Sequence, residues 1–140
     1  MTDIYLLLGS NIPPTFDHLK AAAIAIEKRV GKIVTSSGIY KTEAWGFEDQ
    51  DPFLNQVLQI HSSLQADELL AELLLIEKEI GRIRYKKWHP RTIDIDILLY
   101  GREIIQTKSL SIPHPQIQHR NFTLIPLNEI AMLNLRMWNA

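Results

Sequence analysis

One stretch of sequence most clearly predicts an element of the fold: Thr92-Ile93-Asp94-Ile95-Asp96-Ile97-Leu98-Leu99-Tyr100. Ile93, Ile95, Ile97 and Leu99 alternate with Thr92, Asp94, Asp96 and Leu98, which is the period of a β-strand with one buried face. Asp94 and Asp96 therefore project from the same face of this predicted strand, with Cα atoms about 6.5–7 Å apart. Two carboxylates on one face repel each other, so they face either solvent or bound cations.

Outward from this strand, the hydrophobic periods predict three more strands and two helices. Strands are expected over residues 4–8, 32–42 and 53–62, and helices over 15–30 and 66–80. The apolar face of the first helix is expected to carry Phe16, Leu19, Ala22, Ala23, Ile26 and Val30. That of the second helix is expected to carry Leu69, Leu70, Leu73, Leu74 and Ile80. The order βαββαβ predicts an α/β (α+β) protein with a ferredoxin-like core, in which helices cover one face of a mainly antiparallel sheet. The other face is left for a ligand.

Smaller additions are expected after the last strand of this core. The sequence predicts a small hairpin around residues 102–106, a proline-rich turn over 112–115 and a short helix or two within 121–132.

Composition and charge limit the classes of function. The chain has 140 residues, of which 46% are hydrophobic and 22% charged, so we expect one domain over residues 1–140. The net charge of -1 predicts no general affinity for nucleic acid or an anionic membrane. There is no cysteine, which excludes disulfides and thiolate metal sites. Asp3 stands where a signal peptide would be positive, so we expect a cytoplasmic protein. We take a monomer as the default expectation for its oligomeric state.

A strongly basic segment precedes the acidic strand. Its cationic residues are Arg82, Arg84, Lys86, Lys87 and Arg91, with Trp88 among them and no acid between. One interpretation is a solvated loop. The other is a polyphosphate site, because a metal-bound polyphosphate needs cations on its outer oxygens and carboxylates on its metals.

Three polar residues interrupt apolar patterns. Glu77 lies on the apolar stripe of the second helix, where it either pairs with Arg82 or Arg84 or contacts a ligand. Asn55 lies between Phe53 and Val57, where an inward-facing amide needs several hydrogen bonds and suits the edge of a heterocycle. His114 lies between two prolines, a setting that is more often structural than catalytic.

The chain resembles the 6-hydroxymethyl-7,8-dihydropterin pyrophosphokinase family over nearly its whole length. The resemblance rests on motifs in matching order: Tyr5-Leu6-Leu7-Leu8-Gly9-Ser10-Asn11, Tyr40-Lys41-Thr42-Glu43, Phe53-Leu54-Asn55, Ile76-Glu77-Lys78-Glu79-Ile80-Gly81-Arg82, Trp88-His89-Pro90-Arg91-Thr92-Ile93-Asp94-Ile95-Asp96-Ile97-Leu98, Ile112-Pro113-His114-Pro115 and Arg120-Asn121-Phe122. The block from Pro90 to Leu98 is the most specific of these.

The resemblance implies a reaction and a role for each matching residue. The reaction would transfer diphosphate from ATP to the pterin hydroxymethyl group, with two Mg²⁺ ions held by Asp94 and Asp96. Arg82 and Arg91 would act with these acids in catalysis. The ATP site would comprise Glu77, Arg84, Trp88, Ile97, His114 and Arg120. The pterin site would comprise Thr42, Ala44, Trp45, Phe53, Asn55 and Phe122.

Three other classes of function share parts of this pattern. An RNA-binding module has the same element order, but Asp94 and Asp96 would repel a phosphate backbone unless metals intervened. A metal-dependent phosphohydrolase would use the same acids and arginines with water as nucleophile. A ligand-sensing domain of this fold would bind without turnover, and fold alone does not separate these classes.

Overall fold

The helices and strands of the core follow one another in the predicted order. The computed structural model describes residues 1–42, 52–81, 92–115, 117 and 123–130. The elements are β1 (Thr2–Ser10), α1 (Thr15–Arg29), β2 (Lys32–Ser36), β3 (Tyr40–Thr42), β4 (Phe53–Ser62), α2 (Ala66–Gly81), β5 (Asp94–Tyr100), β6 (Ile105–Gln106) and β7 (Ser111–Ile112). A further helix spans residues 123–130. None of the helices in these ranges has the length and apolar composition of a membrane span.

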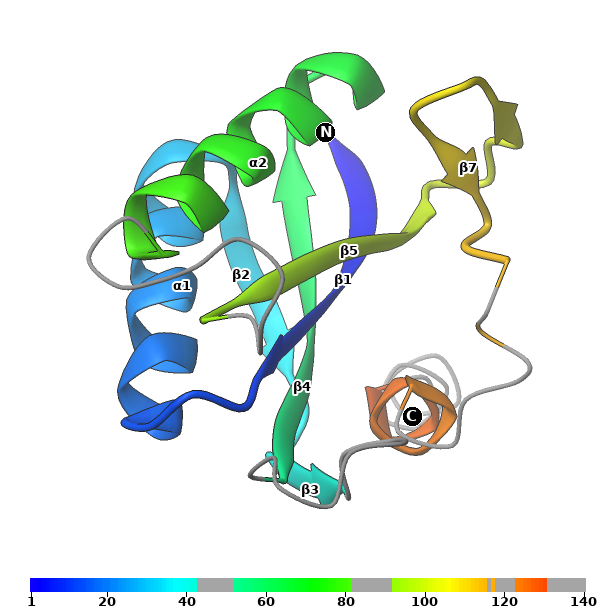
Figure 1. Cartoon of the computed structure of the whole chain (residues 1–140). Helices are drawn as coiled ribbons and strands as arrows, with labels where there is room; N and C mark the ends of the chain where they lie inside the picture. The colour runs from blue at the N-terminus through cyan, green and yellow to red at the C-terminus, as the bar shows by residue number, and fades with distance from the viewer. Residues whose placement is uncertain (43–51, 82–91, 116, 118–122, 131–140) are drawn as a thin grey trace.

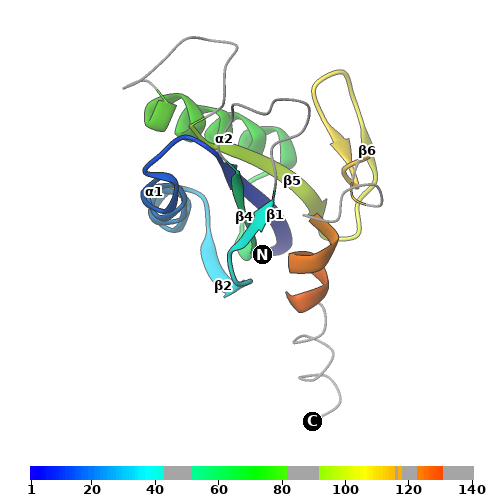
Figure 2. The same ribbon diagram turned by 60° about the horizontal axis from the view of Figure 1, so that its bottom comes forward.

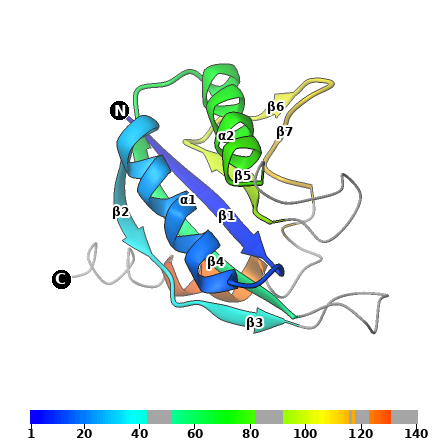
Figure 3. The same cartoon turned by 60° about the vertical axis from the view of Figure 1, so that its left-hand side comes forward.

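The main sheet is antiparallel throughout, in the order β2-β4-β1-β5, with the short β3 also paired to β4. Both helices lie on one side of it, drawn in blue and green in Figures 1 and 3. This arrangement confirms the ferredoxin-like α/β prediction. The centre of the sheet is β1, which pairs with β4 on one side and β5 on the other.

The main core lies between the sheet and the two helices. It contains Leu6 and Leu8 of β1 together with buried residues of both helices. Phe16 and Leu74, which were expected on the apolar helix faces, are 57% and 52% exposed. At 100° per residue they point about 90° and 130° away from the centre of each buried stripe, so these stripes are narrower than predicted.

The predicted strand over residues 32–42 is two strands, β2 and β3, separated by Ser37, Gly38 and Ile39. Ser37 interrupts the regular ladder because its hydroxyl accepts a hydrogen bond from the Val57 N–H, at 2.9 Å. The hairpin expected around 102–106 is displaced along the chain, since its strands are β6 and β7. Its turn is closed by Thr107, whose N–H donates to the Leu110 carbonyl at 2.8 Å.

A β-bulge changes which face the end of β5 presents. Leu6 pairs with Ile97 but Tyr5 pairs with Leu99, so Leu98 is an extra residue in β5. Leu99 was expected on the same face as Ile97. It packs instead with Leu98 on the face away from α1 and α2.

A second, smaller core covers part of that other face. It contains Leu7, Val57, Leu98 and Ile130, and Leu127 packs against it. Ile130 and Leu127 come from the helix over residues 123–130, drawn in orange on the side of the sheet opposite α1 and α2 (Figures 1 and 2). The face that the sequence left for a ligand is therefore only partly open.

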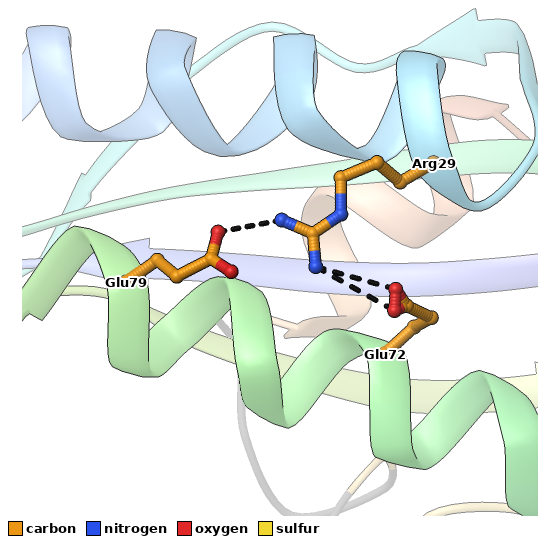
Figure 4. Close-up of polar contacts among 3 residues, drawn as sticks. All are labelled: Arg29, Glu72 and Glu79. Carbon is orange, nitrogen blue, oxygen red and sulfur yellow. Dashed lines mark hydrogen bonds and ion pairs between the residues drawn. The ribbon is translucent and has the colours of Figure 1, made fainter.

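An ionic contact joins the two helices on their outer side. The Arg29 guanidinium of α1 lies between two carboxylates of α2, 3.2 Å from Glu72 and 2.5 Å from Glu79 (Figure 4). These hydrogen bonds, first that to Glu79 and then that to Glu72, raise the pKa of Arg29. The contact joins the C-terminal end of α1 to Glu72 and Glu79, which lie about two helical turns apart on α2.

Candidate active site

The two acids of β5 project from the face of the sheet opposite α1 and α2. Asp96 pairs with Leu7 of β1, and Asp94 pairs with Gly9. Because directly paired residues share a face, the acids lie on the same side as Leu7, which belongs to the second core. Both are half-buried. The structure thus confirms that Asp94 and Asp96 share one face, the face that does not carry the two helices.

An amide and a hydroxyl lie on the same face, on the far side of β1. Asn55 of β4 is 3% exposed, and its Nδ2 donates a hydrogen bond to Thr42 Oγ1 at 3.0 Å. Asn55 pairs with Gly9 on one side and with Tyr40 on the other. Phe53, two residues before Asn55, pairs with Thr42 and is half-buried. Three predicted pterin-site residues, Thr42, Phe53 and Asn55, therefore lie together.

Gly9 separates the acidic group from the amide group. It pairs with both Asn55 and Asp94, so these two residues are two strand spacings apart, or about 9–10 Å. A Cβ added at Gly9 would lie only 2.9 Å from Asn55 Oδ1. The bare backbone of β1 thus gives the buried amide the space that it occupies, and leaves a strip without side chains between the two groups.

Glu77 has a partner that the sequence did not suggest. Its Oε2 accepts a hydrogen bond from the Ile95 N–H at 2.6 Å, which joins α2 to the backbone of β5. Both partners offered by the sequence, Arg82 and Arg84, lie outside the described residues. Since β5 is an edge strand, its outward N–H groups need partners of this kind.

Ile97 and His114 also lie at this edge. Ile97 is 4% exposed and its side chain belongs to the main core, so this side chain does not face a ligand. The backbone N–H of His114 donates to the Leu98 carbonyl at 3.0 Å, which holds the segment after β7 against β5. The predicted ATP-site residues Glu77, Ile97 and His114 therefore all adjoin the outer edge of β5.

The remaining predicted site residues lie outside the described part of the chain. They are Ala44, Trp45, Arg82, Arg84, Trp88, Arg91, Arg120 and Phe122.

The donor set of the acid pair suits a magnesium ion that is shared with phosphate. Mg²⁺ is typically bound through one or two protein carboxylates, with substrate phosphates and waters completing its octahedron. Asp94 and Asp96 supply two carboxylates on one face. Within the described ranges, no three His, Asp or Glu side chains are grouped so that they could hold a metal by themselves. The chain therefore offers an open ligand pair in these ranges, not an all-protein cage.

The family model of 7,8-dihydro-6-hydroxymethylpterin-pyrophosphokinase (HPPK) matches residues 5–132 of the sequence. The chain belongs to this family. The match includes every residue of the acid pair, the amide group and the β5 edge.

Curated relatives agree over most of their own length. The chain is 45% identical over 130 residues to the 2-amino-4-hydroxy-6-hydroxymethyldihydropteridine pyrophosphokinase of Aquifex aeolicus, covering 93% of this chain and 81% of that protein. It is 44% identical over 132 residues to the enzyme of the same name from Haemophilus influenzae, covering 94% and 82%. A crystal structure of an HPPK-DHPS in complex with substrates has the same fold, with a TM-score of 0.72 at 18% identity. The likeness covers 92% of this chain and 40% of that longer one.

Two residues of this pyrophosphokinase-family site were not singled out from the sequence. The Gly9-Ser10-Asn11 segment, which the sequence suggests is a turn after the first strand, was too short a motif to interpret alone; Gly9 and Ser10 are the last residues of β1. In the structure, Gly9 admits the Asn55 amide, and the buried Ser10 hydroxyl donates to the Thr92 carbonyl at 2.5 Å. This bond ties the end of β1 to the residue that lies two positions before Asp94. The glycine that directly follows the predicted strand over residues 4–8, next to polar residues, was the signal available.

Proposed function

We propose that the chain transfers a diphosphate group from ATP to the hydroxymethyl group of 6-hydroxymethyl-7,8-dihydropterin, yielding AMP and the pterin diphosphate for folate synthesis. This is the activity that the names of its curated relatives state. One observation carries the assignment of the site. Asp94 and Asp96 share a face with the Asn55–Thr42 pair, and only Gly9 separates the two groups.

The pterin is assigned to the β4 side of Gly9. A flat, polar bicycle needs an aromatic surface and fixed donors and acceptors at its edge. Phe53 would offer the surface, and Asn55, whose amide is oriented by Thr42, would read the edge. Ala44, Trp45 and Phe122 complete this proposed site by the family resemblance.

ATP is assigned to the β5 side. Asp94 and Asp96 would hold two Mg²⁺ ions, which neutralise and orient the phosphates when bound. Glu77, Ile97 and His114 adjoin the same edge, with Ile97 contributing backbone groups. Arg82, Arg84, Trp88, Arg91 and Arg120 are assigned to ATP by resemblance, with Arg82 and Arg91 acting on the phosphates during the reaction.

The chemical step is an in-line displacement at the β-phosphorus of ATP. The pterin hydroxyl oxygen forms a bond to that phosphorus, the bond from the β-phosphorus to the AMP oxygen breaks, and the hydroxyl proton is lost. The protein's contribution is mainly to position the two substrates on either side of Gly9 and to stabilise charge. No described side chain is assigned as a dedicated general base.

The chain is further proposed to act as a cytoplasmic monomer with one domain. The match of one family model to residues 5–132 supports the single domain. Light scattering on the purified protein would decide the oligomeric state.

Product analysis tests the proposed reaction. The protein is mixed with ATP, Mg²⁺ and the hydroxymethyldihydropterin, and nucleotides and pterins are separated by chromatography. We expect AMP and pterin diphosphate in equal amounts. Asp96→Asn should abolish their formation, and Asp17→Asn, which changes an exposed acid of α1, should leave it unchanged. ADP or free phosphate as the product would identify another kinase or a phosphohydrolase, and binding without turnover would identify a sensing domain.

A further inference from the structure

The helix over residues 123–130 reaches the segment that carries the amide group. It packs on the sheet through Ile130, which is fully buried among Leu7, Val57 and Leu98. This apolar contact places the preceding residue, Glu129, beside the link between β2 and β3. In Figure 2 the helix, in orange, lies across the sheet from α1 and α2.

Glu129 accepts hydrogen bonds from Gly38 in that link and from Tyr40 at the start of β3. The Gly38 N–H lies 3.2 Å from each of its carboxylate oxygens, and the Tyr40 hydroxyl donates to Oε1. These residues are about 90 positions away in sequence, so local chain geometry does not create the contact. A carboxylate that accepts several hydrogen bonds makes stronger bonds than a neutral acceptor. The hydrogen bond to Glu129 also raises the pKa of Tyr40, so this phenol remains a donor to a higher pH than an ordinary tyrosine.

β3 depends on such support because it is short. It has three residues and, within the described part of the chain, pairs only with β4. Tyr40, its first residue, lies directly opposite Asn55, and Thr42, its last residue, accepts the hydrogen bond from Asn55 Nδ2. Tyr40 and Thr42 project to the same face because they are two residues apart. The Glu129 contact and the Asn55–Thr42 bond are therefore connected through the three residues of β3.

We infer that Glu129 is a positioning residue for the pterin site: by fixing Gly38 and Tyr40, it sets the position of β3 and with it the hydrogen bond that orients the Asn55 amide. Glu129 itself touches no proposed substrate position. The inference rests on the proposed assignment of Asn55 and Thr42 to the pterin. It extends that assignment to a helix that no sequence motif had linked to substrate binding.

The first test reads the free protein, so it does not depend on any substrate. The Asn55 side-chain amide signals are followed by ¹⁵N NMR in three variants: Glu129→Gln, Tyr40→Phe and Glu103→Gln. Glu103 is an exposed acid between β5 and β6 and serves as the control. We expect the Asn55 signals to shift in the first two variants and to stay in place in the third. Unchanged Asn55 signals in folded Glu129→Gln would overturn the inference.

The second test separates the two substrates. Affinities for the pterin and for ATP are measured by fluorescence titration and calorimetry in Glu129→Ala, Glu129→Gln and Asn55→Ala. We expect Glu129→Ala to weaken pterin binding about tenfold, which corresponds to the loss of roughly one charged hydrogen bond, with a smaller effect of Glu129→Gln. ATP binding should change less than about twofold, because its proposed site lies across Gly9.

The outcomes distinguish this inference from the proposed function. If Asn55→Ala weakens pterin binding and Glu129→Ala does not, the pterin site stands and the inference is overturned. If neither variant weakens it, the assignment of the pterin to this group is wrong. Equal weakening of pterin and ATP by Glu129→Ala would indicate a general loss of structure and would also overturn a positioning role.

Discussion

Gly9→Ala should separate pterin binding from ATP binding. The new Cβ would lie 2.9 Å from Asn55 Oδ1, and 4.0 Å from the nearest atoms of Leu54 and Phe53. Only the amide contact is too short, so the Asn55 side chain must rotate away. Because this side chain is 3% exposed and hydrogen-bonded to Thr42 at 3.0 Å, rotation breaks that bond inside a packed site.

The cost of this rotation can be estimated from the structure. One lost neutral hydrogen bond and one off-rotamer side chain together cost about 1.5–2.5 kcal/mol, which is a roughly 10- to 70-fold weaker affinity for the pterin. ATP affinity should remain within about twofold, because Asp94 and its edge of β5 are untouched.

Fluorescence titration with the pterin and calorimetry with ATP measure the two affinities. Gly81→Ala is a matched control, since its Cβ would stand 3.9 Å from Thr92, an ordinary contact. The reasoning fails if Gly9→Ala binds the pterin as well as the unchanged protein while Asn55→Ala does not.

Three further substitutions test contacts that stabilise the fold. Gly31→Ala would place a Cβ 2.2 Å from the His61 carbonyl oxygen. Denaturant unfolding should show a free energy of unfolding that is lower by about 2–3 kcal/mol. A decrease below about 1 kcal/mol would mean that the backbone of β4 shifts at little cost. Arg29→Met should lower the melting temperature at low salt but much less at high salt, because its ion pairs are exposed; equal effects at both would exclude an ionic origin. Tyr40→Phe should destabilise the protein at neutral pH. Since the folded pKa of Tyr40 is raised above 10.0, its contribution is complete below that pH and is lost as pH rises through the folded value, so the variant and the unchanged protein should converge in alkaline unfolding curves. A difference in stability between the two proteins that stays constant with pH would show that the Tyr40 hydroxyl does not cause the destabilisation.

The parts of the fold that depend on local periodicity were predicted from the sequence. The alternation around Asp94 and Asp96 assigned both acids to one face, because the face of a strand residue follows from its position alone. Leu99 was assigned wrongly, because a bulge arises from pairing with another strand. The alternation in β5 gives no sign that Tyr5 and Leu6 of β1 are paired to residues two apart.

The hydrogen-bonding partners in the site depend on contacts distant in sequence, and these were not predicted. Glu77 was correctly identified as a carboxylate needing a partner, and one partner in the described part of the chain is a backbone N–H of β5. Asn55 was likewise identified as an amide needing partners, and Thr42 is one of them. A sequence pattern shows that a buried polar group requires a partner, but packing decides which group supplies it.

The supports of the two proposed substrate sites come from different parts of the chain. On the β5 side, Glu77 holds the outer backbone of the strand, and Ser10 holds Thr92 just before Asp94. On the β4 side, Glu129 holds the link before β3. Among the described elements, β1 contacts both sides, and so does the helix over residues 123–130, whose Ile130 packs among Leu7, Val57 and Leu98. At the point where the two sides meet, β1 presents Gly9 with no side chain. The polar supports of the two proposed sites are therefore separate, which is why Glu129→Ala should weaken pterin binding more than ATP binding.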